Sequence, residues 1–146
     1  MSEFIVVLDV ALRNPIIVSI SDFRGESRLD VRHHYEGDDG ELHPTKKGIN
    51  MPALYVPALL IALEAAHPPK GDGPARVQVK VDVREPIFVS VDLYRKELRL
   101  DVRHFYDDHG DLRPGFKGMN MPWAEREKLL EALRTAIIAQ EPEEIV

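Results

Sequence analysis

The sequence predicts an α+β protein made of two β-β-β-β-α repeats. The string "LDVRHHYEGDDGELHPTKKGINMP", which begins at Leu29, returns one residue shorter at Leu100 as "LDVRHFYDDHGDLRPGFKGMNMP". The repetition continues on both sides, because "NPIIVSISDF" matches "EPIFVSVDLY" and "PALLIALEAA" shares its Leu-Leu-x-Ala-Leu spacing with "EKLLEALRTA". Within each copy the apolar period changes from two to about 3.6, which indicates strands followed by a helix. Two copies are too few for a solenoid, so we expect a fused, intramolecular pseudo-dimer.

The first three strands of each copy are predicted from side-chain alternation and flanking turn residues. "FIVVLDVAL" (4–12) and "RVQVKVDVR" (76–84) are rich in β-branched residues and alternate in part. The next segments, 15–23 and 86–94, each open with a proline, which suits the start of a strand. "SRLDVRHHY" and "ELRLDVRHFY" alternate clearly and lead into acidic turns that contain glycine. In the first of these strands we expect one face to hold Leu29, Val31, His33 and Tyr35, and the other Arg28, Asp30, Arg32 and His34.

The fourth strand of each copy is irregular, with a proline and a glycine inside it, so we expect an edge or bulged strand. Pro52 and Pro122 then open the two helices. The second helix is amphipathic, with an apolar stripe of Trp123, Leu129, Leu130, Leu133 and Ile137.

The first helix carries no charge before Glu64, so we expect it to be buried on more than one side. It is either the central core helix or a surface through which two chains associate. Pro57 lies early in this helix and either delays its start or kinks it.

Composition limits the classes of protein. The chain has 146 residues, of which 44% are hydrophobic and 30% charged, as in a globular protein. It has no cysteine, so a disulfide, a zinc-thiolate site and a thiol nucleophile are excluded. The most apolar run is too short to cross a bilayer, and the N-terminus does not resemble a signal peptide, so we expect no membrane association. The Pro- and Gly-rich seam suggests a first repeat at 1–67, a linker at 68–75, a second repeat at 76–140 and an acidic tail at 141–146.

The repeated string resembles the positive cofactor 4 family, whose members are transcriptional coactivators with a C-terminal domain that binds single-stranded DNA. The resemblance rests on Phe23-Arg24-Gly25, then "LDVRHHY", an acidic turn with glycine, "ELHPTKKGI" and a helix, and it occurs twice. It implies strongly curved four-stranded sheets, paired through their helices, with single-stranded DNA lying across the sheets. The partner that usually comes from a second chain is then fused onto this one.

The resemblance also implies the binding residues. The first stacking aromatic falls on Phe23 and Tyr94, and the second, usually Trp in the family, on Tyr35 and Tyr106. The basic positions of the turn and third strand fall on Arg24, Arg95, Arg32 and Arg103, and those of the fourth strand on His43, Lys46, Lys47, Arg113, Phe116 and Lys117. From the residues alone, Arg28 and Arg99 belong to a solvated face, and Asp30 and Asp101 hold neighbouring arginines or backbone groups.

Several residues depart from the family pattern. A lysine becomes Glu26 and Glu97, and fourth-strand bases become His43 and Phe116. With a net charge of −6, these changes predict weaker binding and a shallower salt dependence than in typical members. They also favour the alternative function, a protein-interaction module that keeps the fold without binding nucleic acid.

The histidines and aspartates around both acidic turns fit no ligand spacing, so we expect no metal, no cofactor and no catalysis. The prediction is therefore binding of single-stranded or melted DNA, with RNA as the alternative, in transcription, replication or repair, together with proteins of those processes. The missing Ser- and Lys-rich N-terminal tail favours a bacterial or phage origin and a cytoplasmic, nucleoid-associated location.

Overall fold

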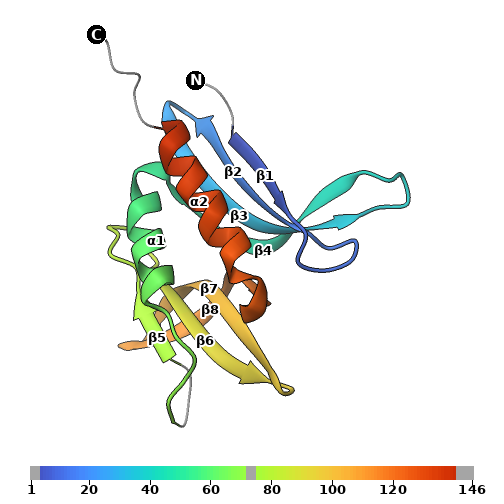
Figure 1. Ribbon diagram of the computed structural model, residues 1–146. Coiled ribbons are helices and arrows are strands. Elements are labelled where there is room, and N and C mark those ends of the chain that lie inside the picture. The colour runs from blue at the N-terminus through green and yellow to red at the C-terminus, as the bar shows by residue number, and fades with distance from the viewer. Residues whose placement is uncertain (1–3, 72–74, 141–146) are drawn as a thin grey trace.

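The computed structural model describes residues 4–71 and 75–140, and holds two four-stranded antiparallel sheets, each followed by a helix (Figure 1). The acidic tail expected at 141–146 lies outside the described residues. In each sheet the strands follow in sequence order, as a meander. No helix in the described ranges is long and apolar enough to span a membrane.

The two repeats have matching elements, as the sequence predicts. The first contains β1 (Phe4–Leu8), β2 (Ile16–Phe23), β3 (Glu26–Glu36), β4 (Leu42–Pro52), a 3₁₀ turn (Ala53–Tyr55) and α1 (Val56–Ala65). The second contains β5 (Ala75–Gln78), β6 (Ile87–Tyr94), β7 (Glu97–Asp108), β8 (Asp111–Pro122), a 3₁₀ turn (Trp123–Glu125) and α2 (Arg126–Gln140). The predicted α+β class and the two β-β-β-β-α units are confirmed.

The first strand of each repeat is shorter than its alternating sequence predicts. β1 ends at Leu8 rather than near residue 12, and β5 ends at Gln78 rather than near residue 84. Just after β1, the N–H of Val10 donates to the carbonyl of Leu8 at 3.0 Å, and the N–H of Val81 donates to that of Val79 at the same distance. A hydrogen bond between residues two apart closes a γ-turn, which takes the chain out of the ladder. Alternation alone does not reveal such a turn.

The fourth strands are bulged and lie at the end of each sheet, as predicted. In the first repeat Arg32 is opposite Gly48 and His34 is opposite Pro44, so residues 45–47 of β4 face His33 alone. In the second repeat, residues 115–117 of β8 face His104 in the same way. A proline cannot donate to a ladder, and a bulge accommodates the extra residues. The bulges therefore contain Lys46 and Lys47 in one repeat, and Phe116 and Lys117 in the other.

One continuous apolar core joins the two repeats. It takes the inner faces of both sheets, including Ile16, Val18, Leu29, Ile87, Val89 and Leu100, none of which is more than 1% exposed. The stripe predicted on α2 enters the same core through Leu129, Leu130 and Leu133. Burial of each such side chain contributes about 1.5–3 kcal/mol relative to leaving it exposed. The two units thus share one apolar core.

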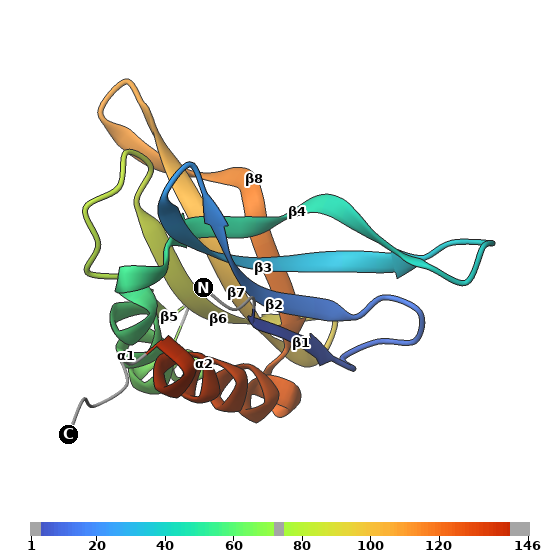
Figure 2. The same cartoon turned by 90° about the horizontal axis from the view of Figure 1, so that it is seen from above.

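The helices cross from one repeat to the other. α2 packs against β1 and β2 of the first repeat, α1 contacts β5 of the second, and the two helices lie side by side (Figures 1 and 2). Lys128 on α2 donates from Nζ to the carbonyl of Asp9 at 2.8 Å, and Arg134 pairs with Glu64 of α1 at 3.7 Å. The fourth strands β4 and β8 also contact each other. Each repeat therefore depends on the other to cover its apolar surface.

α1 is less buried than its apolar sequence predicts. Val56, Leu59 and Leu63 enter the core, whereas Leu54 in the preceding 3₁₀ turn is 71% exposed and Ile61 is 67% exposed. The α-helix begins at Val56, so Pro57 occupies its first turn, where a missing N–H leaves no hydrogen bond unmade. Pro57 thus delays the start of the helix and does not kink it.

Candidate nucleic-acid interface

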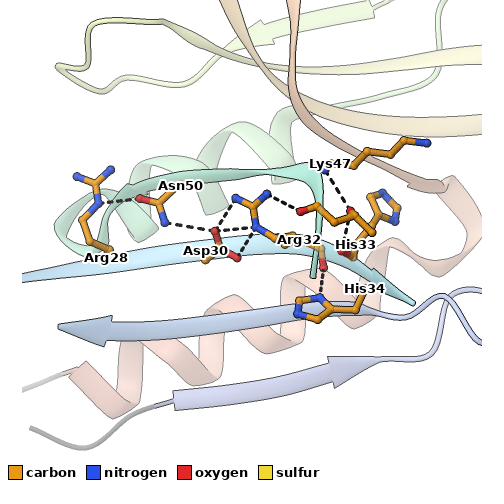
Figure 3. A network of polar contacts seen from close by, with 8 residues as sticks. Arg28, Asp30, Arg32, His33, His34, Lys47 and Asn50 are labelled. Atoms are coloured by element: carbon orange, nitrogen blue, oxygen red, sulfur yellow. Dashed lines mark hydrogen bonds and ion pairs between the residues drawn. The ribbon is translucent and has the colours of Figure 1, made fainter. Parts of the chain in front are cut away.

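The outer face of the first sheet, turned away from the core, carries a chain of polar contacts that we call the polar ladder (Figure 3). Arg28 donates from Nε to Oδ1 of Asn50 at 2.8 Å, and the Asn50 amide donates to Oδ1 of Asp30 at 3.2 Å. Asp30 also accepts from the guanidinium of Arg32 at 2.9 Å. Arg32 in turn donates to the carbonyl of Thr45 at 3.0 Å. The ladder therefore links β3 to the bulge of β4.

The second sheet repeats the ladder with equivalent residues. Arg99 donates to Asn120 at 2.6 Å, Asn120 donates to Asp101 at 3.2 Å, and Arg103 pairs with Asp101 at 3.0 Å. Arg103 also donates to the carbonyl of Gly115 at 2.8 Å. Two copies of the same geometry indicate that the ladder follows from the repeated residues and not from local accident. The repeated "NMP" string was the signal for Asn50 and Asn120, which sequence reasoning missed.

The polar ladder shows which groups Asp30 and Asp101 bind. It also occupies part of the N–H groups of Arg32 and Arg103, so fewer remain for a ligand. Asp30 and Asp101 hold arginines, as expected from the sequence. The side chains of Arg32 and Arg103 are only 21% and 22% exposed, and each donates a hydrogen bond to a backbone carbonyl of a bulge. A guanidinium has five N–H donors, so some remain for an anion after these contacts. Phosphate contact by these two arginines stays a prediction.

The β2–β3 and β6–β7 turns present the first pair of aromatics. Phe23 is 62% exposed and Tyr94 is 61% exposed. The guanidinium carbon of Arg24 lies 5.1 Å from the Phe23 ring centre, and that of Arg95 lies 5.3 Å from the Tyr94 ring centre. Exposed rings with a cation against them are suited to stacking on bases beside phosphates.

The two turns differ at their second central residue. Both central residues of each turn have positive φ, as a type I′ hairpin requires: 52° for Arg24 and 80° for Gly25, 49° for Arg95 and 67° for Lys96. Lys96 therefore adds a cation beside Tyr94 where the first repeat has glycine. Sequence reasoning missed Lys96, although its place between Arg95 and the next strand could have revealed it.

The second pair of aromatics lies on hairpin arms formed by the ends of β3–β4 and β7–β8. Tyr35 and Tyr106 are 47% and 43% exposed. The ring of His43 lies 5.2 Å from that of Tyr35, and its Nε2 is 3.1 Å from Oδ2 of Asp39. Arg113, the equivalent of His43, pairs with Asp108 at 2.6 Å. Both basic positions are thus bound to acids of their own turns.

The pKa of the Asp39 carboxyl is lowered by the N–H of Glu41, which donates to it, and by His43.

The two aromatics of one repeat do not share a face. Phe23 lies on the outer face with Arg28, whereas Tyr35 lies on the opposite side of β3, in line with His33. His33 reaches across to the other repeat, where its Nε2 accepts from the backbone N–H of Asn120 at 3.1 Å. The start of the first repeat's hairpin arm therefore contacts the second repeat's sheet at Asn120.

This arrangement creates two related grooves at the seam. The first seam groove, of about 820 Å³, joins the outer face of the first sheet to the second repeat and includes Arg28, Arg32, Lys46, Asn50, Arg84, Glu85 and Lys117. The second seam groove, of about 600 Å³, joins the outer face of the second sheet to the first repeat and includes Asn14, His33, Lys47, Arg99, Arg103 and Asn120. Most lining positions correspond between the repeats: Arg28 with Arg99, and Glu85 with Asn14.

The cations at the bulges differ in their freedom. In the described ranges Lys46 and Lys47 have no ion pair, whereas Lys117 is bound to Glu85 at 3.1 Å. Phe116, 97% exposed, lines both seam grooves. The structure therefore brings together Arg32, Lys46 and Lys117 in one groove, and Arg103, Phe116 and Lys47 in the other. It does not bring His43 or Arg113 into the linings of these grooves.

His33 is the titratable group of the second groove whose pKa is perturbed. Burial at the seam lowers the pKa below its ordinary value of 6.5, and the positive charges of Lys47 and Arg99 lower it further. The hydrogen bond from Asn120 also requires an unprotonated Nε2. The equivalent His104 is 7% exposed, and its Nδ1 is 2.9 Å from the carbonyl of Glu85.

The part of the chain that the structure describes contains no cluster of three or more His, Asp or Glu able to hold a metal ion. What the site offers is cations, exposed rings and two grooves. Such a surface can bind a polyanion with flat groups.

Comparisons with known proteins agree with the repeated architecture. The family model described as Transcriptional Coactivator p15 (PC4) matches residues 10–62 and again residues 84–132. No curated protein matches the chain. Among solved structures, a chain from the crystal structures of Trypanosoma bruciei MRP1/MRP2 is 14% identical, with a TM-score of 0.43, over 94% of this chain and 84% of that one. The two family matches begin after the first strand of each repeat and end within its helix, and the chain belongs to the PC4 family of transcriptional coactivators, with the family's domain present twice.

Proposed function

We propose that the protein binds single-stranded or melted DNA with little sequence preference, in transcription, replication or repair. The observation that carries this proposal is the pair of related seam grooves, which are lined by arginines and lysines and share the exposed ring of Phe116. Membership of the PC4 family supports the same function.

The chemistry of the grooves suits a single-stranded chain better than a duplex. Stacking on an aromatic ring contributes about 1–3 kcal/mol per base and needs an unpaired base face. Phe23, Tyr94 and Phe116 offer such rings, each more than 60% exposed. Neutralising phosphates with Lys and Arg adds affinity that falls with salt and carries no sequence information.

The proposed contacts divide by chemistry. The rings that stack on bases are Phe23, Tyr35, Tyr94, Tyr106 and Phe116. The groups that meet phosphates are Arg24, Arg95, Lys46, Lys47 and Lys117, with the unused N–H groups of Arg32 and Arg103. His43 and Arg113 contribute only after leaving Asp39 and Asp108, so we assign them a smaller share.

A second function keeps support from the charge distribution. The net charge is −6, and Asp82 and Glu85 line the first seam groove. Like charge repels a phosphate chain, which favours a protein partner, such as a component of the transcription or replication machinery, at that groove. On this alternative the chain binds no nucleic acid.

Fluorescence anisotropy of a labelled single strand of about 20 nucleotides, with a duplex of the same sequence as control, separates the two functions. We expect binding that prefers the single strand and weakens as salt rises. A single-stranded RNA of the same sequence reports the preference between the two nucleic acids. Absence of binding at low salt would reject the proposed function and leave the protein-interaction module.

A further inference from the structure

The two repeats have diverged on their outer faces, although the backbone elements match. Arg76 of β5 pairs with Ser90, and its counterpart opposite Ser19 in the first repeat is Ile5. A cation therefore stands on the edge strand of the second sheet where the first sheet has an exposed aliphatic side chain, 61% exposed.

Arg76 belongs to an aromatic stack that the first repeat lacks. Its guanidinium carbon lies 5.0 Å from the ring centre of Phe105, and that ring lies 4.6 Å from the ring of Phe88. The corresponding residues of the first repeat are His34 and Ile17, by register and by alignment. Phe105 is only 4% exposed, so the stack serves to hold the Arg76 guanidinium in place on the sheet. A cation that is positioned in advance loses less side-chain entropy when it meets a phosphate.

This stack borders a hollow on the outer face of the second sheet. The hollow, of about 420 Å³, includes Arg76, Ser90, Tyr94, Arg99, Phe105 and Asn120. Arg99 and Asn120 also line the second seam groove. The hollow, which includes Tyr94, and the groove, which includes Lys47, therefore adjoin at Arg99 and Asn120.

Several charges favour the second path, although Asp92 of the hollow stands where the first repeat has Ser21, and Arg84 adds a cation to the first seam groove only. Lys96 adds a cation beside Tyr94 where the first repeat has Gly25. In the first seam groove Glu85 engages Lys117, and Asp82 adds a second carboxylate, whereas no carboxylate lines the second seam groove. Asp92 and Asp101 are the acids in the hollow; Asp92 accepts from the N–H of Leu93 at 2.8 Å, and Asp101 is bound within the polar ladder.

We propose that the second repeat carries the primary face for single-stranded nucleic acid, running from Tyr94 across Arg76 and Arg99 to Phe116 and Lys47. The first repeat's face is a secondary site of lower affinity. This inference rests on the proposed function and adds to it a division of labour that two identical subunits could not have.

Reciprocal exchanges between the repeats test the inference on a short strand of about 8 nucleotides, which is long enough for one face. Arg76→Ile with Lys96→Gly gives the second repeat the residues of the first. We expect affinity to fall by about tenfold and the salt slope to drop by one to two, because each lost phosphate contact lowers the slope by about 0.7–0.9.

Matched variants provide the comparison. Arg95→Ala in the second turn should weaken binding several times more than Arg24→Ala in the first, since the positions are equivalent. Arg76→Lys keeps the charge and should retain most of the salt slope, which separates loss of a phosphate contact from loss of folding. Glycine adopts the positive φ of position 96 without the steric cost of a Cβ, so a loss of affinity in Lys96→Gly would not come from unfolding.

The outcomes separate the two proposals. Binding by the unaltered chain with equal losses from Arg24→Ala and Arg95→Ala, or with no change from the Arg76 and Lys96 exchanges, overturns the inference and leaves the proposed function standing. If the unaltered chain binds no single strand at low salt, the proposed function itself fails, and the inference with it.

Discussion

Glycine at position 48 is required by the crossing of Arg32 over the backbone of β4. A Cβ built there would lie 2.8 Å from the carbonyl oxygen of Val31 and 2.9 Å from Cβ of Arg32. Those neighbours cannot move without disturbing the backbone pairing of β3 with β4. The residue therefore matters through the space it leaves and not through a side chain.

Gly48→Ala should destabilise the protein by on the order of 1–3 kcal/mol, as overpacking does in a close-packed site. Chemical denaturation followed by circular dichroism measures the change. Gly71→Ala is the matched control, because nothing lies within 4 Å of a Cβ at that position and its φ is not left-handed. An unchanged midpoint for Gly48→Ala would show that the bulge adapts freely.

The two arm tyrosines are tested by removing their rings together. Tyr35→Ala with Tyr106→Ala should weaken single-strand binding by several-fold or more, because each ring lost removes a stacking partner. The double Phe variant keeps the rings and should bind as the unaltered protein does. Anisotropy reports affinity and circular dichroism confirms folding. If the alanine and phenylalanine variants bind equally well, the rings do not stack on bases.

Among the elements, the β6–β7 turn combines strain with charge. Lys96 has a φ of 67°, a region in which an L-residue with a Cβ is disfavoured by about 1–2 kcal/mol. The equivalent turn uses Gly25. A lysine retained in such a backbone suggests that its charge has a use outside the folding of the hairpin.

Lys96→Gly should raise the free energy of unfolding by about 0.5–1 kcal/mol, since glycine adopts positive φ without the steric cost but has more entropy to lose on folding. Thermal or denaturant unfolding measures the gain, and Arg95→Ala, which leaves a Cβ at a positive φ, serves as the comparison. A loss of stability in Lys96→Gly would mean that the lysine side chain itself stabilises the turn.

The contact between β3 and β8 through His33 predicts a pH dependence of stability. Burial lowers the pKa of His33 below 6.5, so the unfolded chain binds a proton more readily than the folded one does. The free energy of unfolding should therefore fall as the pH drops below about 6.5, towards the lowered pKa.

His33→Gln should flatten this dependence, because a glutamine oxygen can accept from Asn120 without titrating. Denaturation curves at pH 7.5 and at pH 5.5 measure the difference, with His67→Gln in the exposed segment after α1 as control. An equal pH dependence in His33→Gln and in the unaltered protein would assign it to other groups.

At the scale of the whole molecule, each seam groove takes one wall from each repeat. β4 contacts β8, α2 packs against the first sheet, and α1 contacts β5 of the second sheet. The grooves are therefore complete only when both repeats are folded and packed together, and each repeat expressed alone would expose the apolar surface that the other covers.

The relation between the grooves predicts a preference for DNA geometry. In the pseudo-dimer that the repeated sequence predicts, the two sites would present opposite directions to a bound chain, so a bubble with two antiparallel strands could fill both. We expect tighter binding of a bubble than of a linear strand with the same number of unpaired nucleotides, because the second contact becomes intramolecular. Competition between the two labelled DNAs measures the ratio. Equal affinity would show that only one groove is in use.

Local patterns in the sequence were enough to predict the strands, the two helices and their duplication. Alternation through "LDVRHHY" and "LDVRHFY", the prolines and glycines of the fourth strands and the stripe on α2 each depend on neighbours in the chain, and local geometry enforces them. For Phe23, Tyr94 and the lysines, the prediction of a binding role came from the family resemblance and not from these patterns. They could not show that γ-turns end β1 and β5, since those depend on a hydrogen bond that alternation does not encode.

The hydrogen bonds and ion pairs between these residues became visible only in the tertiary structure. Arg32 is tied to Asp30 and to the β4 bulge, His33 reaches Asn120 of the other repeat, and Glu85 takes up the charge of Lys117. Residues as far apart in the chain as Asp9 and Lys128 also meet in this way. Such contacts arise only when two sheets and two helices bury one common core. The spacing of residues along the chain does not predict which of them meet between the two repeats.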